Sequence, residues 1–363
     1  MSSRADAALP GAPAGRAGSS GERHRNRLPF GAVLGICLGV LTASIVLSFF
    51  IGRFQVAPGD ALRIMAARVA PVVRTWDPLE EQVVWDIRWP RILMAVLVGS
   101  ALSCSGATYQ GVFRNPLVSP DILGVTAAAS FGAAVGIVLA DPYSPAVQVL
   151  AFCCGAAGVG TAYLLARVRG TVPNVMLILA GVVVSSVFNA GVSVMKYLAD
   201  PQDELPAITF WLMGSLAGMR WANLAFAAPI ILLGGAVLWV FSWRLNLLTM
   251  GDEEARSLGV DTARLKTIAV LCATAMTATA VSQCGAIGWI GLVMPHMARM
   301  LVGPDHRRLL PTAAVLGGAF LLLIDNLTRT AAAAALPLSI PTAFIGAPFF
   351  ALLLRRTRQE WAQ

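Results

Sequence analysis

The chain has 363 residues, of which 57 % are hydrophobic and only 13 % are charged. About a quarter of the residues in soluble domains are charged, so this composition excludes a soluble globular protein and indicates an integral membrane protein. The formal net charge of +8 comes from arginines that the membrane topology gathers on one side, and it does not imply a nucleic-acid partner.

Residues 1–27 are rich in Ala, Gly, Ser and Arg, which predicts a disordered basic tail rather than a signal peptide. Ten apolar segments follow, and each is expected to be a helix because lipid cannot hydrogen-bond free backbone groups. They cover residues 30–51, 90–112, 122–140, 146–166, 174–198, 221–243, 265–284, 287–302, 309–330 and 340–354. The sequence therefore predicts an all-α integral membrane protein, with one ten-helix domain over residues 28–358 and a short tail over 359–363.

The basic residues predict the orientation of these helices. The N-terminal tail carries five arginines, and placing it in the cytoplasm puts most of the other basic loops on the same side. Those loops contain Arg114, Arg167, Arg169, Arg244, Arg256, Arg264, Lys266, Arg307, Arg308, Arg355, Arg356 and Arg358. This is the positive-inside pattern, so both termini are predicted to be cytoplasmic.

A compact charged segment, MGDEEARSLGV, lies between two apolar segments at residues 250–260. Acidic residues 252–254 come first and Arg256 follows, an order that suits the dipole of a short helix. Gly251 and Gly259 bracket the segment. We expect a short amphipathic helix at the membrane surface, on which a soluble partner can push; the alternative is a solvated loop between two spans.

On the predicted outer side, Arg88 and Arg91 lie at the mouth of the second apolar segment and Arg329 lies at the end of the ninth. Guanidinium groups there suit bidentate capture of a partner's carboxylates, although a solvated loop of balanced charge is the simpler alternative. Asp325 is the one clear acid inside an apolar segment, four residues before Arg329. This spacing favours a structural salt bridge over a proton relay.

The sequence contains no pattern of a catalytic or metal-binding site. Its histidines lack ligand spacing, its cysteines form no CxxC pair, and it has no GxxxxGK[ST] loop for phosphates. We therefore expect no catalytic residue, no metal and no cofactor on this chain. Energy for transport would then come from a partner, and the alternatives are an ion-coupled secondary transporter or a membrane-embedded enzyme.

Separated motifs in a fixed order carry a family resemblance over nearly all of residues 28–358. The first is WDIRWPRILMAVLVGSALSCSGATYQGVFRNPLVSPDILG at residues 85–124. The others are LILAGV (177–182), FWLMGSLAG (210–218), LNLLTMGDEEARSLGV (245–260), GAIGWIGLVMPHMARMLVGPDHRRLLP (285–311) and TAFIGAPFF (342–350). Together they resemble the FecCD-type permeases, the membrane subunits of type II ABC importers for iron-siderophores, haem and cobalamin.

The resemblance implies the type II ABC importer permease fold in the bacterial inner membrane. It also implies a homodimer around a central pathway, two copies of an ATPase that holds ATP and Mg, and a periplasmic substrate-binding protein. The residues that would couple to the ATPase are Gly251, Asp252, Glu253, Glu254, Ala255, Arg256, Leu258 and Gly259. Arg88, Arg91 and Arg329 would dock the binding protein. The cytoplasmic gate would comprise Thr171, Val172, Pro173, Asn174 and Val175.

The sequence departs from the family pattern in two places, and the second departure bears on the gate and on the cargo. The outer motif that commonly reads ELPxG is here AALPLSIP, with Ala335 and Ser339 at the Glu and Gly positions. The gate sequence TVPN at 171–174 also differs from the polar loop of the cobalamin permease. We therefore expect an iron-siderophore complex as cargo, with haem or cobalamin as the alternatives within the family.

Overall fold

The computed structural model describes the backbone of residues 28–52, 54–167, 172–331 and 336–361, with the side chains of the last helix as far as residue 352. The predicted tail over 1–27 and Thr171 of the predicted gate lie outside the described residues. Within the described ranges the regular elements are helices, as expected, and no strand occurs.

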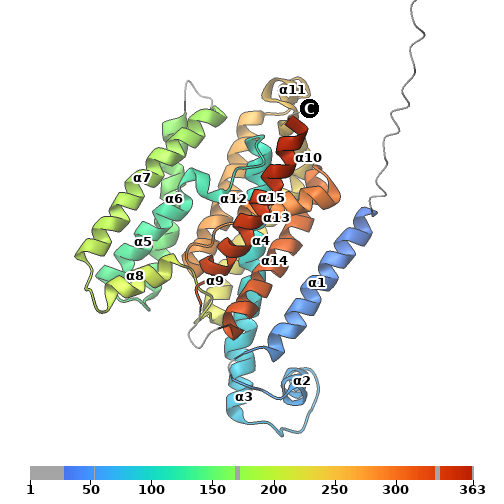
Figure 1. Cartoon of the computed structure of the whole chain (residues 1–363), viewed down its shortest axis with the longest axis vertical. Helices are drawn as coiled ribbons and strands as arrows, with labels where there is room; N and C mark the ends of the chain where they lie inside the picture. Colours follow the sequence, from blue (N-terminus) through green and yellow to red (C-terminus); the bar gives the residue numbers. More distant parts are fainter. Residues whose placement is uncertain (1–27, 53, 168–171, 332–335, 362–363) are drawn as a thin grey trace, which may run out of the picture.

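The helices follow one another in the order of the apolar segments (Figure 1). The first half contains α1 (Phe30–Phe50), α2 (Pro58–Ala66), α3 (Pro78–Gln82), a π-helix (Val83–Arg88), α4 (Trp89–Val112), a 3₁₀ turn (Pro120–Leu123), α5 (Val125–Leu139), α6 (Pro145–Ala166) and α7 (Asn174–Leu198). The second half contains α8 (Glu204–Leu212), α9 (Trp221–Val240), α10 (Ser242–Met250), α11 (Asp252–Ser257), α12 (Thr262–Cys284), α13 (Ile290–Val302), α14 (His306–Thr330) and α15 (Ser339–Trp361).

Seven of the described helical stretches are long and apolar enough to cross a membrane. Three further apolar helices are shorter, and each overlaps one of the remaining predicted segments; they are Val125–Leu139, Ile290–Val302 and Ser339–Leu352. The bounds differ from the predicted ones, for example in two places. The predicted segment 221–243 divides at Phe241 into α9 and α10, and α15 continues to Trp361, past the expected end of the domain at residue 358.

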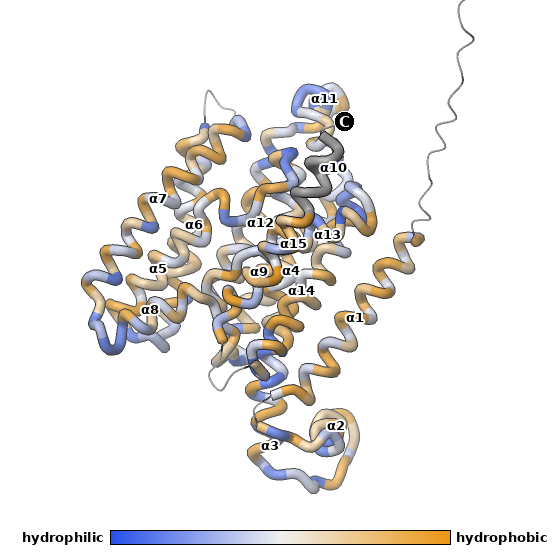
Figure 2. Tube along the Cα trace, viewed as in Figure 1, coloured by the Kyte–Doolittle hydropathy of each residue, from blue (hydrophilic) through white to orange (hydrophobic). Residues whose placement is uncertain are grey.

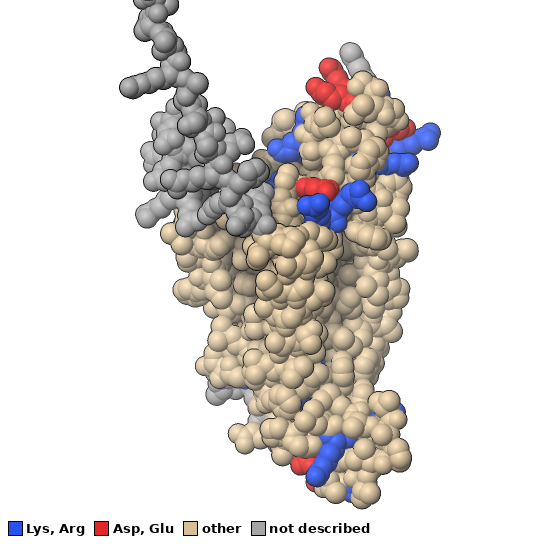
Figure 3. All heavy atoms as spheres, turned by 90° about the vertical axis from the view of Figure 1, so that its right-hand side faces the viewer, with Lys and Arg blue, Asp and Glu red and all other residues tan. Residues whose placement is uncertain are grey.

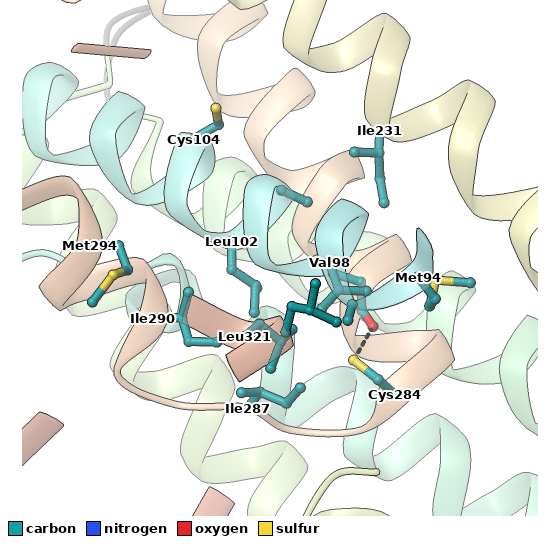
Figure 4. Close-up of a cluster of buried hydrophobic side chains, with 14 of the residues drawn as sticks. Met94, Val98, Leu102, Cys104, Ile231, Cys284, Ile287, Ile290, Met294 and Leu321 are labelled. Carbon is teal, nitrogen blue, oxygen red and sulfur yellow. Dashed lines mark hydrogen bonds between the residues drawn. The ribbon is translucent and has the colours of Figure 1, made fainter. Parts of the chain in front are cut away.

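The core of the molecule surrounds α4, which packs against α9, α12, α13 and α14. Figure 4 shows side chains from these helices meeting in one cluster, among them Val98, Ile231 and Leu321. Gly99 of α4 faces Gly317 of α14, and a Cβ atom on either residue would overlap the backbone of the other helix. Such close approach matters in lipid, because tight packing replaces the hydrophobic effect as the force between helices.

The remaining helices flank this core. In Figure 1 a second group, α5 to α8, lies to the left, and α1 lies along α14 on the right. Helix α12 also packs against α5 and α6, so it joins the two groups.

The molecule has two polar ends with an apolar band between them. The α11 end contains α11, the start of α1 and the end of α15, whereas α2 and α3 form the opposite end, here called the α3 end (Figure 1). Hydrophilic stretches gather near these ends in Figure 2, and the face shown in Figure 3 carries its charged side chains there. Helix α14 runs between the ends, and its 25 residues correspond to about 37 Å, enough to cross the hydrocarbon of a bilayer.

Candidate functional site

At the α11 end, the charged segment forms the short helix expected from its sequence. Helix α11 covers Asp252–Ser257 and stands between α10 and α12. It can turn sharply at both ends because Gly251 has a φ of 142° and Gly259 a φ of 81°, a conformation that costs little only for glycine. The two glycines therefore set the helix apart from the spans on either side.

The side chains of α11 divide into two sets. Ala255 is fully buried against its neighbours, whereas Glu253, Glu254, Arg256 and Leu258 are exposed. Buried Ala255 holds the helix to the rest of the protein, and the exposed set offers acidic, basic and apolar groups side by side. Such a mixed face, on a helix at one end of the molecule, suits contact with another protein.

The first residue of α11 makes a contact that the sequence did not reveal. The carboxylate of Asp252 lies 2.7 Å from the ammonium of Lys266 on α12. The same ammonium donates to the side-chain oxygen of Asn174, the first residue of α7, at 3.2 Å. Asn174 in turn donates to the carbonyl of Val112, the last residue of α4, at 3.1 Å.

The described part of the predicted gate is thus linked to α11 through Asn174 and Lys266. Val172 and Pro173 precede α7, with Pro173 at the N-cap, and Val175 is 67 % exposed. Asn174 is the described member of this group whose side chain hydrogen-bonds to other helices. Sequence spacing could not have predicted that Asn174, Asp252 and Lys266 meet, because they belong to three separate helices.

At the α3 end, two of the three predicted docking arginines share one carboxylate. Arg91 donates to both oxygens of Asp325 at 3.0 and 3.1 Å through Nε, and again at 2.8 Å through its terminal nitrogen. Arg329 pairs with Asp325 at 3.2 Å, which confirms the salt bridge expected from their spacing. The Asp325 side chain is fully buried, and the side chains of Arg91 and Arg329 are 16 % and 8 % exposed.

Arg88 completes the cluster without a carboxylate partner among the described residues. It is 4 % exposed and donates to the backbone carbonyls of Phe49 and Phe54, where α1 ends. Arg329 likewise donates to the carbonyl of Ile51 at 3.1 Å. We call Arg88, Arg91, Arg329 and Asp325 the arginine cluster. It joins α1, α4 and α14, and it contains three cations for one anion.

A pocket of about 280 Å³ opens beside this cluster. The lining residues are Gly52, Phe54, Val83, Ile87, Arg88, Arg91, Ala217 and Arg329. All three guanidinium groups therefore border one pocket even though they lie mostly out of solvent. A buried excess of positive charge is costly, and an incoming carboxylate would offset it.

Comparison with known proteins places the chain in a family. The family model described as the FecCD transport family matches residues 40–356, which is most of the sequence. The chain belongs to the FecCD transport family.

Relatives of known name agree with this assignment. The chain is 38 % identical to the molybdate import system permease protein of Haemophilus influenzae, over 92 % of this chain and 96 % of that protein. It is 41 % identical to the cobalamin import system permease protein of Halobacterium salinarum, over 82 % and 79 %. It is 42 % identical to the Fe(3+) dicitrate permease protein FecD of Escherichia coli, over 83 % and 96 %.

A solved structure supports the fold as well. It is an inward-facing conformation of an ABC transporter of the metal-chelate type, 37 % identical, with a TM-score of 0.80 over 90 % of this chain and 99 % of that one. This FecCD member is therefore a multi-pass membrane protein of the cell membrane and a permease of an ABC importer. It is a transport subunit rather than an enzyme.

Proposed function

We propose that this chain is the membrane subunit of an ATP-driven importer that takes an iron-siderophore complex from a periplasmic binding protein and releases it into the cytoplasm. The observation that carries the proposal is the FecCD match over residues 40–356, together with an exposed charged helix between two spans. The proposed topology has ten membrane crossings, with both termini in the cytoplasm. The start of α1 and the end of α15 lie at the same end, which an even number of crossings requires.

The α11 end is the proposed contact with the ATPase, with one ATPase copy for each copy of this chain; the two ATPase copies hold the ATP and Mg. Residues 251–259 would seat on the ATPase through exposed Glu253, Glu254, Arg256 and Leu258, while buried Ala255 anchors the helix to the spans. A rigid helix set off by Gly251 and Gly259 can transmit a push, whereas a solvated loop would absorb it. The described gate residues Val172, Pro173, Asn174 and Val175 lie at the same end and would close the pathway on that side.

The α3 end is the proposed docking site for the binding protein. Arg88, Arg91 and Arg329 line one pocket, and the single carboxylate of Asp325 pairs with Arg91 and Arg329 but not with Arg88, so the pocket retains positive charge for an acidic side chain. Because these arginines are buried, a partner must insert its carboxylate into the pocket rather than cover a flat surface. Docking therefore depends on shape as well as on charge.

A second copy of the chain is the proposed partner within the membrane. Helix α7 packs against α5 and α6 and exposes apolar side chains on its other side. These include Val175, Leu179, Val183, Val187 and Val194. A two-fold dimer is the commonest assembly of identical subunits, and it would present one α11 to each ATPase copy. Elsewhere the apolar faces would contact membrane lipid.

Molybdate is a second candidate cargo, because the molybdate permease is similar over 92 % of this chain. Relatives named for cobalamin, hemin and iron chelates keep those cargoes open too. These cargoes differ greatly in size and charge. The identity of the binding protein that docks at the α3 end should decide among them.

The proposed function is tested by reconstitution. The chain, its ATPase and its binding protein are placed in proteoliposomes, and uptake of a ferric siderophore, haem, cobalamin and molybdate is measured with and without ATP. We expect ATP-dependent uptake of the ferric siderophore that stops when the ATPase is omitted. Uptake driven by an ion gradient without ATP would contradict the importer, and ATP-dependent uptake of another cargo alone would contradict the siderophore.

The homodimer is tested by weighing the intact complex. Native mass spectrometry of an active complex should give two copies of this chain, two of the ATPase and one binding protein. An active complex with a single copy of the chain would exclude the homodimer.

A further inference from the structure

Two structural units meet at the α11 end, where the side chain of Lys266 forms hydrogen bonds to both of them. Helix α11 packs against α10 and α12, whereas α7 packs mainly against α5, α6 and the 3₁₀ turn. Lys266 of α12 lies between these units, with the Asp252 carboxylate on one side and the Asn174 amide on the other. The contacts run in sequence from α11 through Lys266 to α7.

The chain of contacts continues to the centre of the molecule. Val112 is the last residue of α4, so its carbonyl has no partner within that helix, and Asn174 fills this role. Because Asn174 accepts from Lys266 with its oxygen, its nitrogen faces Val112. The hydrogen bonds run from the Asp252 carboxylate through the Lys266 ammonium and the Asn174 amide to the Val112 carbonyl. The ammonium therefore orients the amide that bonds to the end of α4.

The environment of Lys266 makes its two partners necessary. The Lys266 side chain is only 12 % exposed, while that of Asp252 is 36 % exposed. A mostly buried ammonium is costly unless paired and hydrogen-bonded, so Lys266 must follow Asp252 if α11 moves. The contact from Lys266 to Asn174 is already 3.2 Å long, and a shift of about 0.5 Å would carry it past the range of a good hydrogen bond.

We propose that Lys266 is a positioning residue that transmits the movement of α11 to the first turn of α7 and the end of α4. This inference rests on the proposed role of α11 as the contact with the ATPase. Movement of Asp252 draws the ammonium away from Asn174 or toward it, which releases or fixes the start of α7. ATP-driven motion at the surface is thereby coupled to a helix that packs mainly in the other unit.

The test measures how many ATP molecules the reconstituted complex hydrolyses for each cargo molecule imported. Lys266→Met keeps a long, unbranched side chain but removes its charge and its donor. We expect the ratio to rise about fivefold or more, which corresponds to the lower end of coupling energies between two sites. Lys266→Arg keeps a donor for each partner and should restore most of the coupling. The matched control is Lys196→Met, which changes the only other lysine, at the far end of α7.

A second comparison separates coupling from simple loss of stability. Asp252→Ala and Asn174→Leu each remove one partner of the same ammonium. If the relay exists, each variant raises the ratio, and adding Lys266→Met to either produces no further multiplication, because the three residues act as one unit. Rises in the ratio that multiply independently would overturn the relay. If Lys266→Met alone fails to reach the membrane, the double variant that combines the Asp252 and Asn174 substitutions provides the same comparison.

The outcome is distinguishable from failure of the proposed function. Wild-type complex without ATP-dependent uptake would contradict the importer itself. Wild-type complex that imports with ATP, while Lys266→Met keeps the wild-type ratio, would contradict only the relay.

Discussion

At the α3 end, three arginines lie buried around Asp325, whereas at the α11 end Glu253 and Glu254 project from a short helix into solvent. The arginines bind the Asp325 carboxylate of α14 and backbone carbonyls just beyond the end of α1, whereas the glutamate side chains form no hydrogen bond or salt bridge with another span among the described residues. Charge at the first end is part of the structure, and charge at the second is available to a partner. The same type of substitution should therefore unfold the protein at one end and disconnect it from a partner at the other.

The largest expected effect comes from Asp325→Asn. It leaves Arg91 and Arg329 buried without a carboxylate, a loss of about 3–5 kcal/mol for a broken buried pair. The amount of protein in the membrane and its thermal unfolding temperature should both fall. The control is Asp261→Asn, which weakens an exposed pair with Arg264 and should cost less than about 1 kcal/mol. Equal unfolding temperatures for the two variants would show that the arginine cluster does not stabilise the fold.

The next effect is on association with the ATPase. Glu253→Lys combined with Glu254→Lys should lower its affinity about a hundredfold and abolish uptake, because reversed charges across an interface cost several kcal/mol. Deletion of residues 251–259 should have the same result. Thermal stability should not change in the double variant, since both side chains are exposed. Asp86→Lys, at the opposite end, serves as the control, and normal uptake by the double variant would show that α11 is only a loop.

A smaller effect tests docking. Reversing the charge at Arg88 and Arg91, and then also at Arg329, should lower the affinity of the binding protein for this chain. It would also leave the buried Asp325 carboxylate without a cationic partner. Arg88→Gln is sharper, because Arg88 contacts only backbone carbonyls among the described residues. We expect the association rate of the binding protein to fall about tenfold and to depend less on salt. An unchanged rate at low salt would remove Arg88 from the docking site.

The smallest effect concerns the geometry of α11. Gly259→Ala adds no clash, but a φ of 81° costs about 1 kcal/mol for any residue with a Cβ. Uptake should slow while the charges of α11 remain. Gly35→Ala in α1, where a Cβ meets nothing within 4 Å, is the control and should not slow uptake. Equal uptake rates would show that the position of α11 is not critical.

The sequence by itself determined the class of protein and the position of its helices. Apolar segments of about 20 residues must form helices in lipid, so each predicted segment overlaps a helix of the structure. The acidic start of α11 and its flanking glycines also predicted this short helix, because the preferences for charges at a helix end and for glycine in a turn act over a few residues. The i,i+4 spacing also predicted the Asp325–Arg329 pair, which the structure confirms.

Only the tertiary structure decided which distant residues meet. Arg91 reaches Asp325 across 234 positions of sequence, and Lys266 reaches Asn174 across 92. Nothing in the local sequence showed that the arginines would be buried, since a basic residue at the mouth of a span is usually exposed. Helix packing decides these contacts, because the crossing of α4 with α14, fixed where Gly99 meets Gly317, sets which side chains face one another at the ends of the spans.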